Sequence, residues 1–181
     1  MGGVRPLPGA VVAPGAVALA ALPLAGCGGS GRPACPAGGT APVERGTQPG
    51  TRYLTSVAVT RTACGDRVAF AFEHGVPGYR VEYRSAKDAR TEDASGRQIP
   101  VAGGAFLVVR LADAATARTD GGTLARTYAG PRRVAAGAAA HVREVVKTGD
   151  FEAVVTWAIG LDGKRPFAVA EDDGTLAIDV R

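Results

Sequence analysis

The stretch GDRVAFAFEHGVPGYRVEYR (residues 65–84) decides the fold class of this 181-residue chain. In its first half, Val68, Phe70 and Phe72 alternate with small or polar residues, and in its second half Tyr79 and Tyr83 alternate with charged ones. A period of two is typical of a β-strand with one buried face. The Pro-Gly between the halves favours a tight turn, because Pro presets φ and Gly accepts a positive φ. The stretch therefore predicts two strands joined by a turn.

The same pattern recurs along the rest of the chain from residue 51 onward. It predicts eight short strands, at residues 53–60, 67–73, 79–84, 106–111, 141–147, 151–159, 166–170 and 176–180. Asp162-Gly163 predicts a hairpin turn between the sixth and seventh strands. Residues 85–104 are predicted to be mostly loop, and the Ala-rich residues 134–140 are not counted as helix because a glycine interrupts them. Eight short strands separated by turns predict an all-β fold, either a sandwich or a barrel.

Residues 1–26 predict a lipoprotein signal peptide. Arg5 precedes an apolar run whose cleanest part is about half the ~20 residues that a membrane-spanning helix needs. Leu24-Ala25-Gly26-Cys27 resembles the lipobox of bacterial lipoproteins, which implies cleavage before Cys27 and a diacylglyceryl group on its thiol. Two acyl chains anchor a protein stably, so we expect it at the outer face of the cytoplasmic membrane. The alternatives are an ordinary secretory signal with an incidental cysteine, or an uncleaved anchor.

Residues 27–50 predict a flexible tether, because almost half of them are Gly or Pro. The folded domain is then residues 51–181. With Cys27 lipidated, Cys35 and Cys64 remain, and an oxidising compartment favours a disulfide between them that closes a loop of about 30 residues. The alternative leaves Cys64 as a small core residue and Cys35 as a free thiol in the tether.

Residues with catalytic or metal-binding chemistry are few. His74 and His141 are the only histidines, so a three-histidine zinc site is excluded, and neither HExxH nor G-x-S-x-G occurs. The acidic residues 171–173 favour a solvated turn over a weak calcium site. We therefore expect no catalysis, no metal and no cofactor. An enzyme of unfamiliar type would need His141, Asp150 and Glu152 to meet in one cleft.

The charge of the chain excludes one class of partner and permits another. The formal net charge is +4, and loss of Arg5 with the signal peptide leaves 20 − 17 = +3. The basic residues are spread along the chain without a stripe or motif, so no nucleic-acid binding is expected. An anionic envelope polymer or a lipid headgroup is permitted. The absence of Asn and the excess of Arg over Lys are typical of a GC-rich genome such as that of an actinobacterium.

Tyr79, Arg80 and Tyr83 are the candidate ligand-binding residues, because aromatic rings near Arg are common in carbohydrate recognition. The alternative is that aromatics at a spacing of two belong to the core. Trp157 is expected in the core for the same reason.

Four blocks of the sequence carry a family resemblance: GDRVAFAF (65–72), VPGYRVEY (76–83), VREVVKTGDFE (142–152) and WAIGLDG (157–163). They resemble the AMIN-like domain of actinobacterial secreted proteins and lipoproteins, over roughly residues 53–180. The resemblance implies a β-sandwich of two antiparallel sheets.

The related AMIN domain accompanies cell-wall amidases and secretion pores, which implies a non-catalytic role in binding peptidoglycan or another envelope component. The amidase domain itself is missing, so its activity does not transfer. The alternative is a protein–protein interaction module for an envelope partner.

Overall fold

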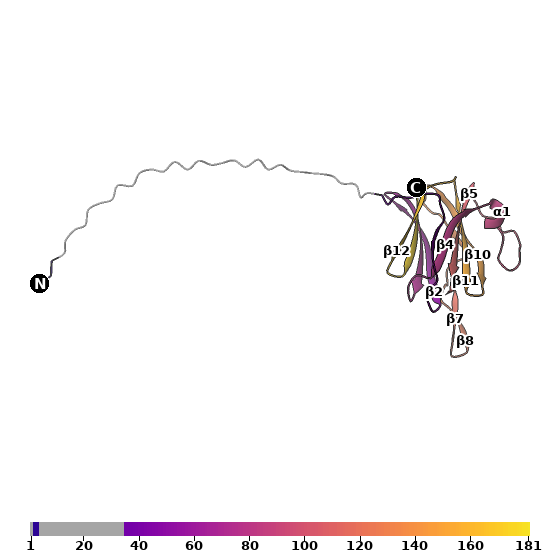
Figure 1. Ribbon diagram of the computed structural model, residues 1–181, viewed down its shortest axis with the longest axis horizontal. Coiled ribbons are helices and arrows are strands. Elements are labelled where there is room, and N and C mark those ends of the chain that lie inside the picture. The colour runs from indigo at the N-terminus through magenta and orange to yellow at the C-terminus, as the bar shows by residue number, and fades with distance from the viewer. Residues whose placement is uncertain (1, 4–34) are drawn as a thin grey trace. The chain divides into compact units, whose positions relative to one another are not determined.

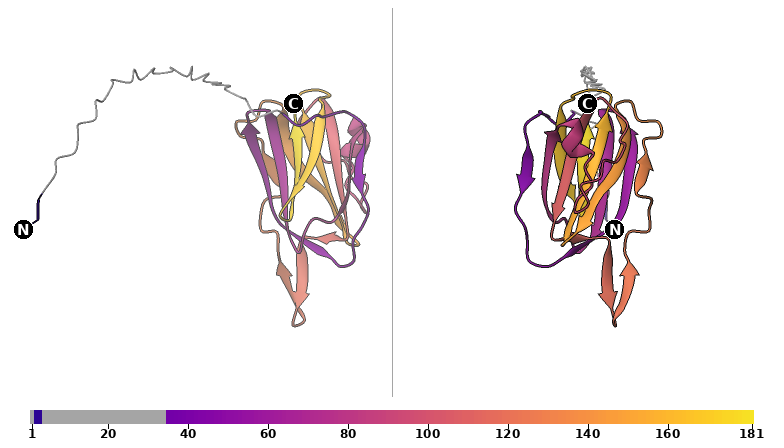
Figure 2. Two further views of the ribbon diagram at one scale, coloured as in Figure 1. Left: turned by 60° about the vertical axis from the view of Figure 1, so that its left-hand side comes forward. Right: turned by 90° about the vertical axis from the view of Figure 1, so that its right-hand side faces the viewer.

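Thirteen strands and one short helix form the part of the chain that the computed structural model describes, residues 2–3 and 35–181 (Figure 1). Residues 35–181 make up one unit, in which two sheets lie face to face (Figure 2). Residues 4–26 of the predicted signal peptide and Cys27 lie outside the described residues. Within the described ranges, no helix has the length and apolarity needed to cross a bilayer.

The larger sheet has six strands in the order β1-β4-β5-β11-β10-β9, and all neighbours are antiparallel. Its strands are β1 (Val43–Arg45), β4 (Gly78–Arg84), β5 (Ala105–Ala112), β11 (Val154–Leu161), β10 (Val142–Phe151) and β9 (Arg133–Ala135). Central β5 and β11 are largely apolar, as expected of strands covered on both faces.

The smaller sheet has five strands in the order β12-β13-β3-β2-β6. These are β12 (Phe167–Asp172), β13 (Thr175–Val180), β3 (Gly65–Glu73), β2 (Arg52–Thr62) and β6 (Ala114–Ala115). Only the short β2–β6 pair is parallel. A separate hairpin of β7 (Ala117–Asp120) and β8 (Thr123–Arg126) projects beyond one end of the sandwich (Figures 1 and 2).

The main core lies between the two sheets. Trp157 is fully buried at its centre, with its ring 5.9 Å from Phe70 and 5.6 Å from Tyr128, centroid to centroid, in edge-on contacts. The expectation that Trp157 belongs to the core is confirmed. Each large side chain buried in this way contributes roughly 1.5–3 kcal/mol, so the sandwich is held together mainly by this layer.

A second, smaller apolar cluster covers the outer face of the six-stranded sheet. Residues 85–104 fold across that face as α1 (Ala86–Ala89) and a loop, and Ala89, Ile99 and Val101 pack on Phe106 and Val146. Ser85 caps the helix by accepting a hydrogen bond from the backbone of Asp88. The segment predicted as loop is therefore fixed against the sheet.

The eight predicted strands correspond to β2, β3, β4, β5, β10, β11, β12 and β13. Two details of that prediction are wrong. The strand predicted at 151–159 is split, because the chain reverses at Glu152-Ala153, both with positive φ (49° and 58°). Asp162-Gly163 is not a hairpin turn, because β11 and β12 belong to different sheets. The all-β sandwich itself is confirmed.

The described residues ahead of residue 51 differ from the expected flexible tether. Cys35 forms a disulfide with Cys64, with 5.5 Å between the Cα atoms. Gly39 and Phe167 exchange backbone hydrogen bonds of 3.0 and 2.7 Å, and β1 pairs with β4 at the edge of the larger sheet. Sixteen residues expected in the tether, 35–50, thus belong to the compact unit, which begins at Cys35.

Candidate functional site

The three residues expected to bind a ligand do not share a surface. Tyr79 lies on the inner side of β4 and donates a hydrogen bond to Glu171 (2.9 Å), and burial together with that bond raises its pKa to about 12. Tyr83 is half-buried on the same side and donates to the backbone oxygen of Arg165 (2.7 Å). Arg80 lies on the opposite side, paired with Glu44 and Glu82. The alternation of β4 thus places Tyr79 and Tyr83 on one face of the strand and Arg80 on the other.

The residues of the enzyme alternative are also apart. His141 precedes β10, 3.2 Å from the Asp162 carboxylate, whereas Asp150 and Glu152 lie at the other end of that strand. The acidic residues 171–173 form the β12–β13 turn region. Among the described residues, no three His, Cys, Asp or Glu side chains are grouped so that they could hold a metal ion.

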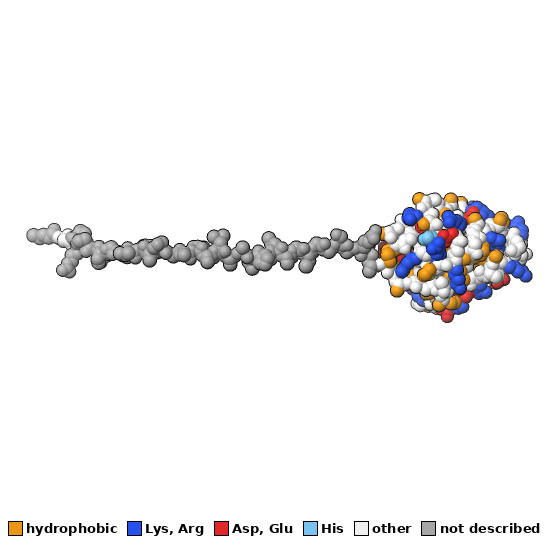
Figure 3. Space-filling view, turned by 90° about the horizontal axis from the view of Figure 1, so that it is seen from above, with side chains coloured by type: hydrophobic (Ala, Val, Ile, Leu, Met, Phe, Trp, Pro, Cys, Tyr) orange, Lys and Arg blue, Asp and Glu red, His pale blue; other side chains and the backbone are white. Residues whose placement is uncertain are grey.

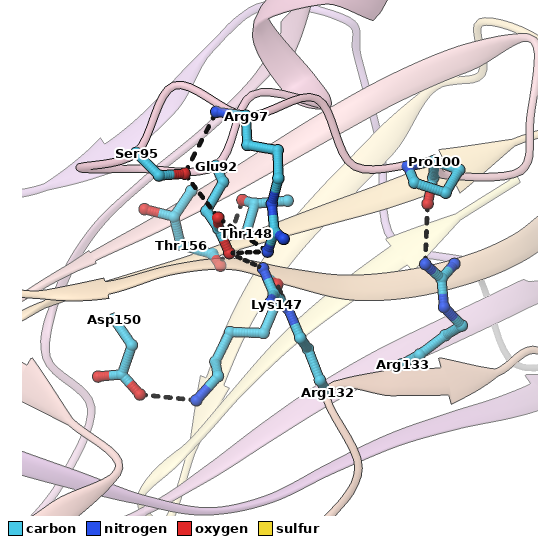
Figure 4. Close-up of polar contacts among 10 residues, drawn as sticks. All are labelled: Glu92, Ser95, Arg97, Pro100, Arg132, Arg133, Lys147, Thr148, Asp150 and Thr156. Atoms are coloured by element: carbon cyan, nitrogen blue, oxygen red, sulfur yellow. Dashed lines mark hydrogen bonds and ion pairs between the residues drawn. The ribbon is translucent and has the colours of Figure 1, made fainter.

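A hollow lies on the described surface where the loop after α1, the segment from β6 to β9 and the end of β10 meet. Its volume is about 600 Å³. Four separate segments line it: residues 92–94, 116–117, parts of 124–132, and 147–151. Figure 4 shows several of its polar side chains. We refer to this site as the hollow.

Glu92 is the centre of a charged network on one wall of the hollow (Figure 4). Its carboxylate accepts hydrogen bonds from Ser95 (2.6 Å) and Arg132 (2.5 Å) and pairs with Arg97 (3.1 Å). The Ser95 bond and the Arg132 bond lower the pKa of Glu92 to about 2. Glu92 is therefore ionised at neutral pH. Its carboxylate holds the loop and Arg132 in place.

Asp93 attaches the same loop to the sheet. Its carboxylate accepts a hydrogen bond from Thr156 (2.7 Å), and its backbone N–H donates to Thr148 (3.0 Å). The carboxylate lies directly over Gly149, where an added Cβ would be 1.9 Å from Oδ2. The loop can come this close because residue 149 has no side chain.

The floor of the hollow is formed by the end of β10 and by Tyr128. Lys147 donates to Asp150 (2.6 Å), which also accepts a bond from Thr116 (Figure 4 shows the first pair). Tyr128 is buried under the Lys147 ammonium, 6.0 Å from ring centroid to Nζ, and donates to Pro131 (2.8 Å). Burial raises the pKa of Tyr128, so its hydroxyl stays protonated.

The rim of the hollow carries the groups that are free to meet a ligand. Leu124 on β8 is 72% exposed and Phe151 at the end of β10 is 56% exposed, and they are the two large hydrophobic side chains exposed on the described surface. Arg126 is exposed and has no hydrogen-bond or ion-pair partner among the described residues. The hollow thus combines apolar surface, hydrogen-bonding groups and the guanidinium of Arg126, which has no partner among the described residues.

This arrangement is suited to binding. The carboxylates Glu92, Asp93 and Asp150 are each committed to hydrogen bonds with neighbouring side chains. A cavity of a few hundred Å³ with apolar walls and a few convergent polar groups is the usual form of a small-ligand site. Sequence reasoning missed the hollow because its four segments are distant along the chain and none carries a local motif.

The fold is a β-sandwich of two packed sheets with a hollow on its surface. The family model of the AMIN-like domain matches residues 52–181, and the chain belongs to the AMIN-like domain family. AMIN-like domains are generally non-catalytic binding modules, and the family is associated with the cell envelope and peptidoglycan. No curated protein and no solved structure matches the chain.

Proposed function

We propose that this protein is a lipid-anchored, non-catalytic envelope protein that binds peptidoglycan through the hollow. In this proposal the acylated Cys27 holds the chain at the outer face of the cytoplasmic membrane, and the domain of residues 35–181 presents the binding site. Family membership supports an envelope location and a binding role. The observation that carries the choice of site is the exposed pair Leu124 and Phe151 on the rim of a 600 Å³ hollow.

The chemistry of the hollow supports a glycopeptide ligand. Sugar rings have apolar faces that pack on aromatic side chains, and Phe151 supplies such a surface beside hydrogen-bonding groups such as Thr116. The peptide stems of peptidoglycan carry carboxylates. Arg126 is the exposed cation of the rim without a described partner, and a guanidinium binds a carboxylate through two parallel hydrogen bonds.

A protein partner is the second candidate, and one observation favours it. The same Leu124 and Phe151 would also suit a hydrophobic contact with another envelope protein, because aromatic anchors dominate such interfaces. The two candidates differ in one measurable way, since only peptidoglycan binding survives when every protein partner has been removed from the wall.

The test is retention of residues 28–181 on purified insoluble cell wall that has been stripped of protein. Retention on intact wall at moderate salt, together with loss of retention after lysozyme digestion, is the expected result. A matched comparison uses Arg126→Gln against Arg110→Gln, because both are exposed cations without described partners and only Arg126 lines the hollow. Absence of retention on intact wall would contradict peptidoglycan binding and favour the protein partner.

A further inference from the structure

The disulfide joins the first residue of the compact unit, Cys35, to one end of the sandwich. Cys64 is in the β2–β3 turn, and β13 and β11 end while β10 begins at the same end of the sandwich. The backbone N–H groups of residues 140–142 donate to Asp66, and that of Asp162 donates to the carbonyl of His141. The turn at 62–65, the start of β10 and the loop at 162–166 are thus tied together. We refer to these segments, with residue 181, as the disulfide end.

Chain length keeps the disulfide end close to residue 27. Cys27 and Cys35 are eight positions apart along the chain. This stretch spans at most about 26–29 Å when fully extended, at about 3.3–3.6 Å per residue. If Cys27 is lipidated as proposed above, the disulfide end is held within a few tens of ångströms of the bilayer.

The disulfide end is basic. Arg61, Arg143 and Lys164 are exposed, and among described residues Arg61 has no partner while Arg143 has only a 3.8 Å contact with Asp162. The basic residues of this end are Arg61, Arg67, Arg143, Lys164, Arg165 and Arg181, against the acidic residues Asp66, Glu144, Asp162 and Asp179. Figure 3 views the molecule from this end, where Lys and Arg side chains cover more of the surface than Asp and Glu.

The excess of positive charge at this end accounts for that of the whole unit. The chain has 21 basic and 17 acidic residues, and omission of Arg5 and Arg32 leaves 19 against 17, or +2, for residues 35–181. Six basic and four acidic residues give 6 − 4 = +2 at the disulfide end, so the remainder is 0. Asp66 and Asp179 are buried and bound to backbone N–H groups and to Arg67 respectively, so they offer little charge to the surface.

The opposite end has the opposite character. Three hairpin turns lie there, and each carries an acidic residue: Asp120 in β7–β8, Glu152 in β10–β11 and Asp173 in β12–β13. An anionic membrane surface attracts the basic end and repels the acidic turns. The charge distribution and the disulfide therefore favour the same orientation, although they are independent features of the chain.

We propose that the disulfide end is a membrane-docking surface that binds the anionic headgroups of a phospholipid bilayer. Arg61, Arg143 and Lys164 make the headgroup contacts, and the hairpin end with the hollow faces away from the membrane. The short chain between Cys27 and the Cys35–Cys64 disulfide would raise the local concentration of this surface at the bilayer. The orientation rests on lipidation of Cys27, whereas the affinity for anionic lipid rests on the charges alone.

Co-sedimentation of residues 28–181 with vesicles tests the affinity without acyl chain or cell wall, so its outcome is independent of the proposed function. The fragment contains the whole compact unit, both cysteines of the disulfide and the core, and a melting curve checks the fold of each variant. We expect binding to phosphatidylcholine/phosphatidylglycerol vesicles, none to pure phosphatidylcholine, and a decline when salt rises from about 0.01 to about 0.15 M.

The deciding comparison uses two triple variants with equal loss of charge. Arg61→Gln, Arg143→Gln and Lys164→Gln together should weaken binding on the order of 100-fold, at about fivefold per cation. Arg97→Gln, Arg110→Gln and Arg126→Gln remove three exposed cations elsewhere and should weaken it far less. An equal loss of vesicle binding in the two triple variants would overturn the proposal. Failure of the wild-type fragment to bind anionic vesicles would also overturn it.

Discussion

The carboxylate of Asp93 occupies the space above Gly149, so that a Cβ added at residue 149 would lie 1.9 Å from its Oδ2 and 2.9 Å from its Cβ. This contact brings the loop after α1 onto the end of β10, and the hollow is formed where the two meet. The site thus depends on a position that has no side chain.

Gly149→Ala should therefore displace Asp93 and break its hydrogen bond with Thr156. We expect the free energy of unfolding to fall by about 1–3 kcal/mol, because a charged hydrogen bond is lost. Denaturant unfolding measures this directly. The control is Gly163→Ala, where nothing lies within 4 Å of the added Cβ, and its effect should stay within about 0.5 kcal/mol. Equal effects of the two substitutions would refute the role of this contact.

Asp66 makes the stability of the domain depend on acid. Burial by itself raises the pKa of Asp66, but the N–H groups of residues 140–142 stabilise its charged form, and the net result is a pKa below the ordinary 3.8. A carboxyl group with a lowered folded pKa contributes stability that is complete above the unfolded pKa and is lost as pH falls through the folded value. The free energy of unfolding should therefore decline below about pH 4. Glu92 and Asp162, whose pKa values are lowered to about 2, act in the same direction.

Asp66→Asn should lower the free energy of unfolding at neutral pH by about 2–4 kcal/mol, because its amide N–H₂ cannot accept the backbone donors. It should also flatten the decline between neutral and acidic pH. Unfolding curves across that range test both effects. Asp120→Asn, at the exposed tip of the β7–β8 hairpin, is the matched control and should change neither. A steep decline that persists in Asp66→Asn would show that other carboxylates are responsible.

The Cys35–Cys64 disulfide closes a segment with a sequence separation of 29. Chain entropy gives such a cross-link about 3–4 kcal/mol, so Cys35→Ser with Cys64→Ser should destabilise the domain by about that amount. Ala63→Ser is the control, because it is an exposed neighbour of Cys64 that takes no part in the disulfide. Thiol labelling of residues 28–181 should detect no free thiol before reduction and two afterwards. Two labelled thiols without reductant would rule out the disulfide.

The predictable part of the fold is its alternating strands. Residues 65–84 contain the β3 and β4 pattern in full, because one face of each strand is buried and the other is not. The β10–β11 hairpin could not be located in the same way. Its turn is Glu152-Ala153, with positive φ at both residues, and neither residue type is typical of that conformation. Asp162-Gly163 carries the stronger turn signal, yet it connects the two sheets.

The hollow and the position of the N-terminal segment were beyond sequence reasoning for a different reason. β1 and the backbone bonds of Gly39 depend on partners far along the chain, in β4 and at Phe167, and the composition of residues 35–50 gives no sign of them. Tyr79 and Tyr83 were recognisable as one face of a strand. Only the packing of the second sheet decides that this face is internal, with Tyr79 held by Glu171.

Cys27→Ala should release the protein from the membrane fraction, because it removes the thiol that carries the proposed acyl chains. Fractionation of cells that express each variant measures this. Cys35→Ala is the control, since it also removes one cysteine but leaves the lipobox Leu24-Ala25-Gly26-Cys27 intact. Membrane retention of Cys27→Ala at the level of the control would contradict lipid anchoring.

The central claim is that the hollow binds peptidoglycan, and a binding isotherm on protein-free insoluble wall tests it most directly. The wild-type fragment of residues 28–181 is compared with Arg126→Gln/Phe151→Ala and with Arg110→Gln, after equal melting temperatures have been verified. The account predicts that the double variant binds the wall at least about tenfold more weakly, as expected when anchor residues are lost, while Arg110→Gln binds like the wild type. Equal affinity of all three proteins for intact wall would contradict it.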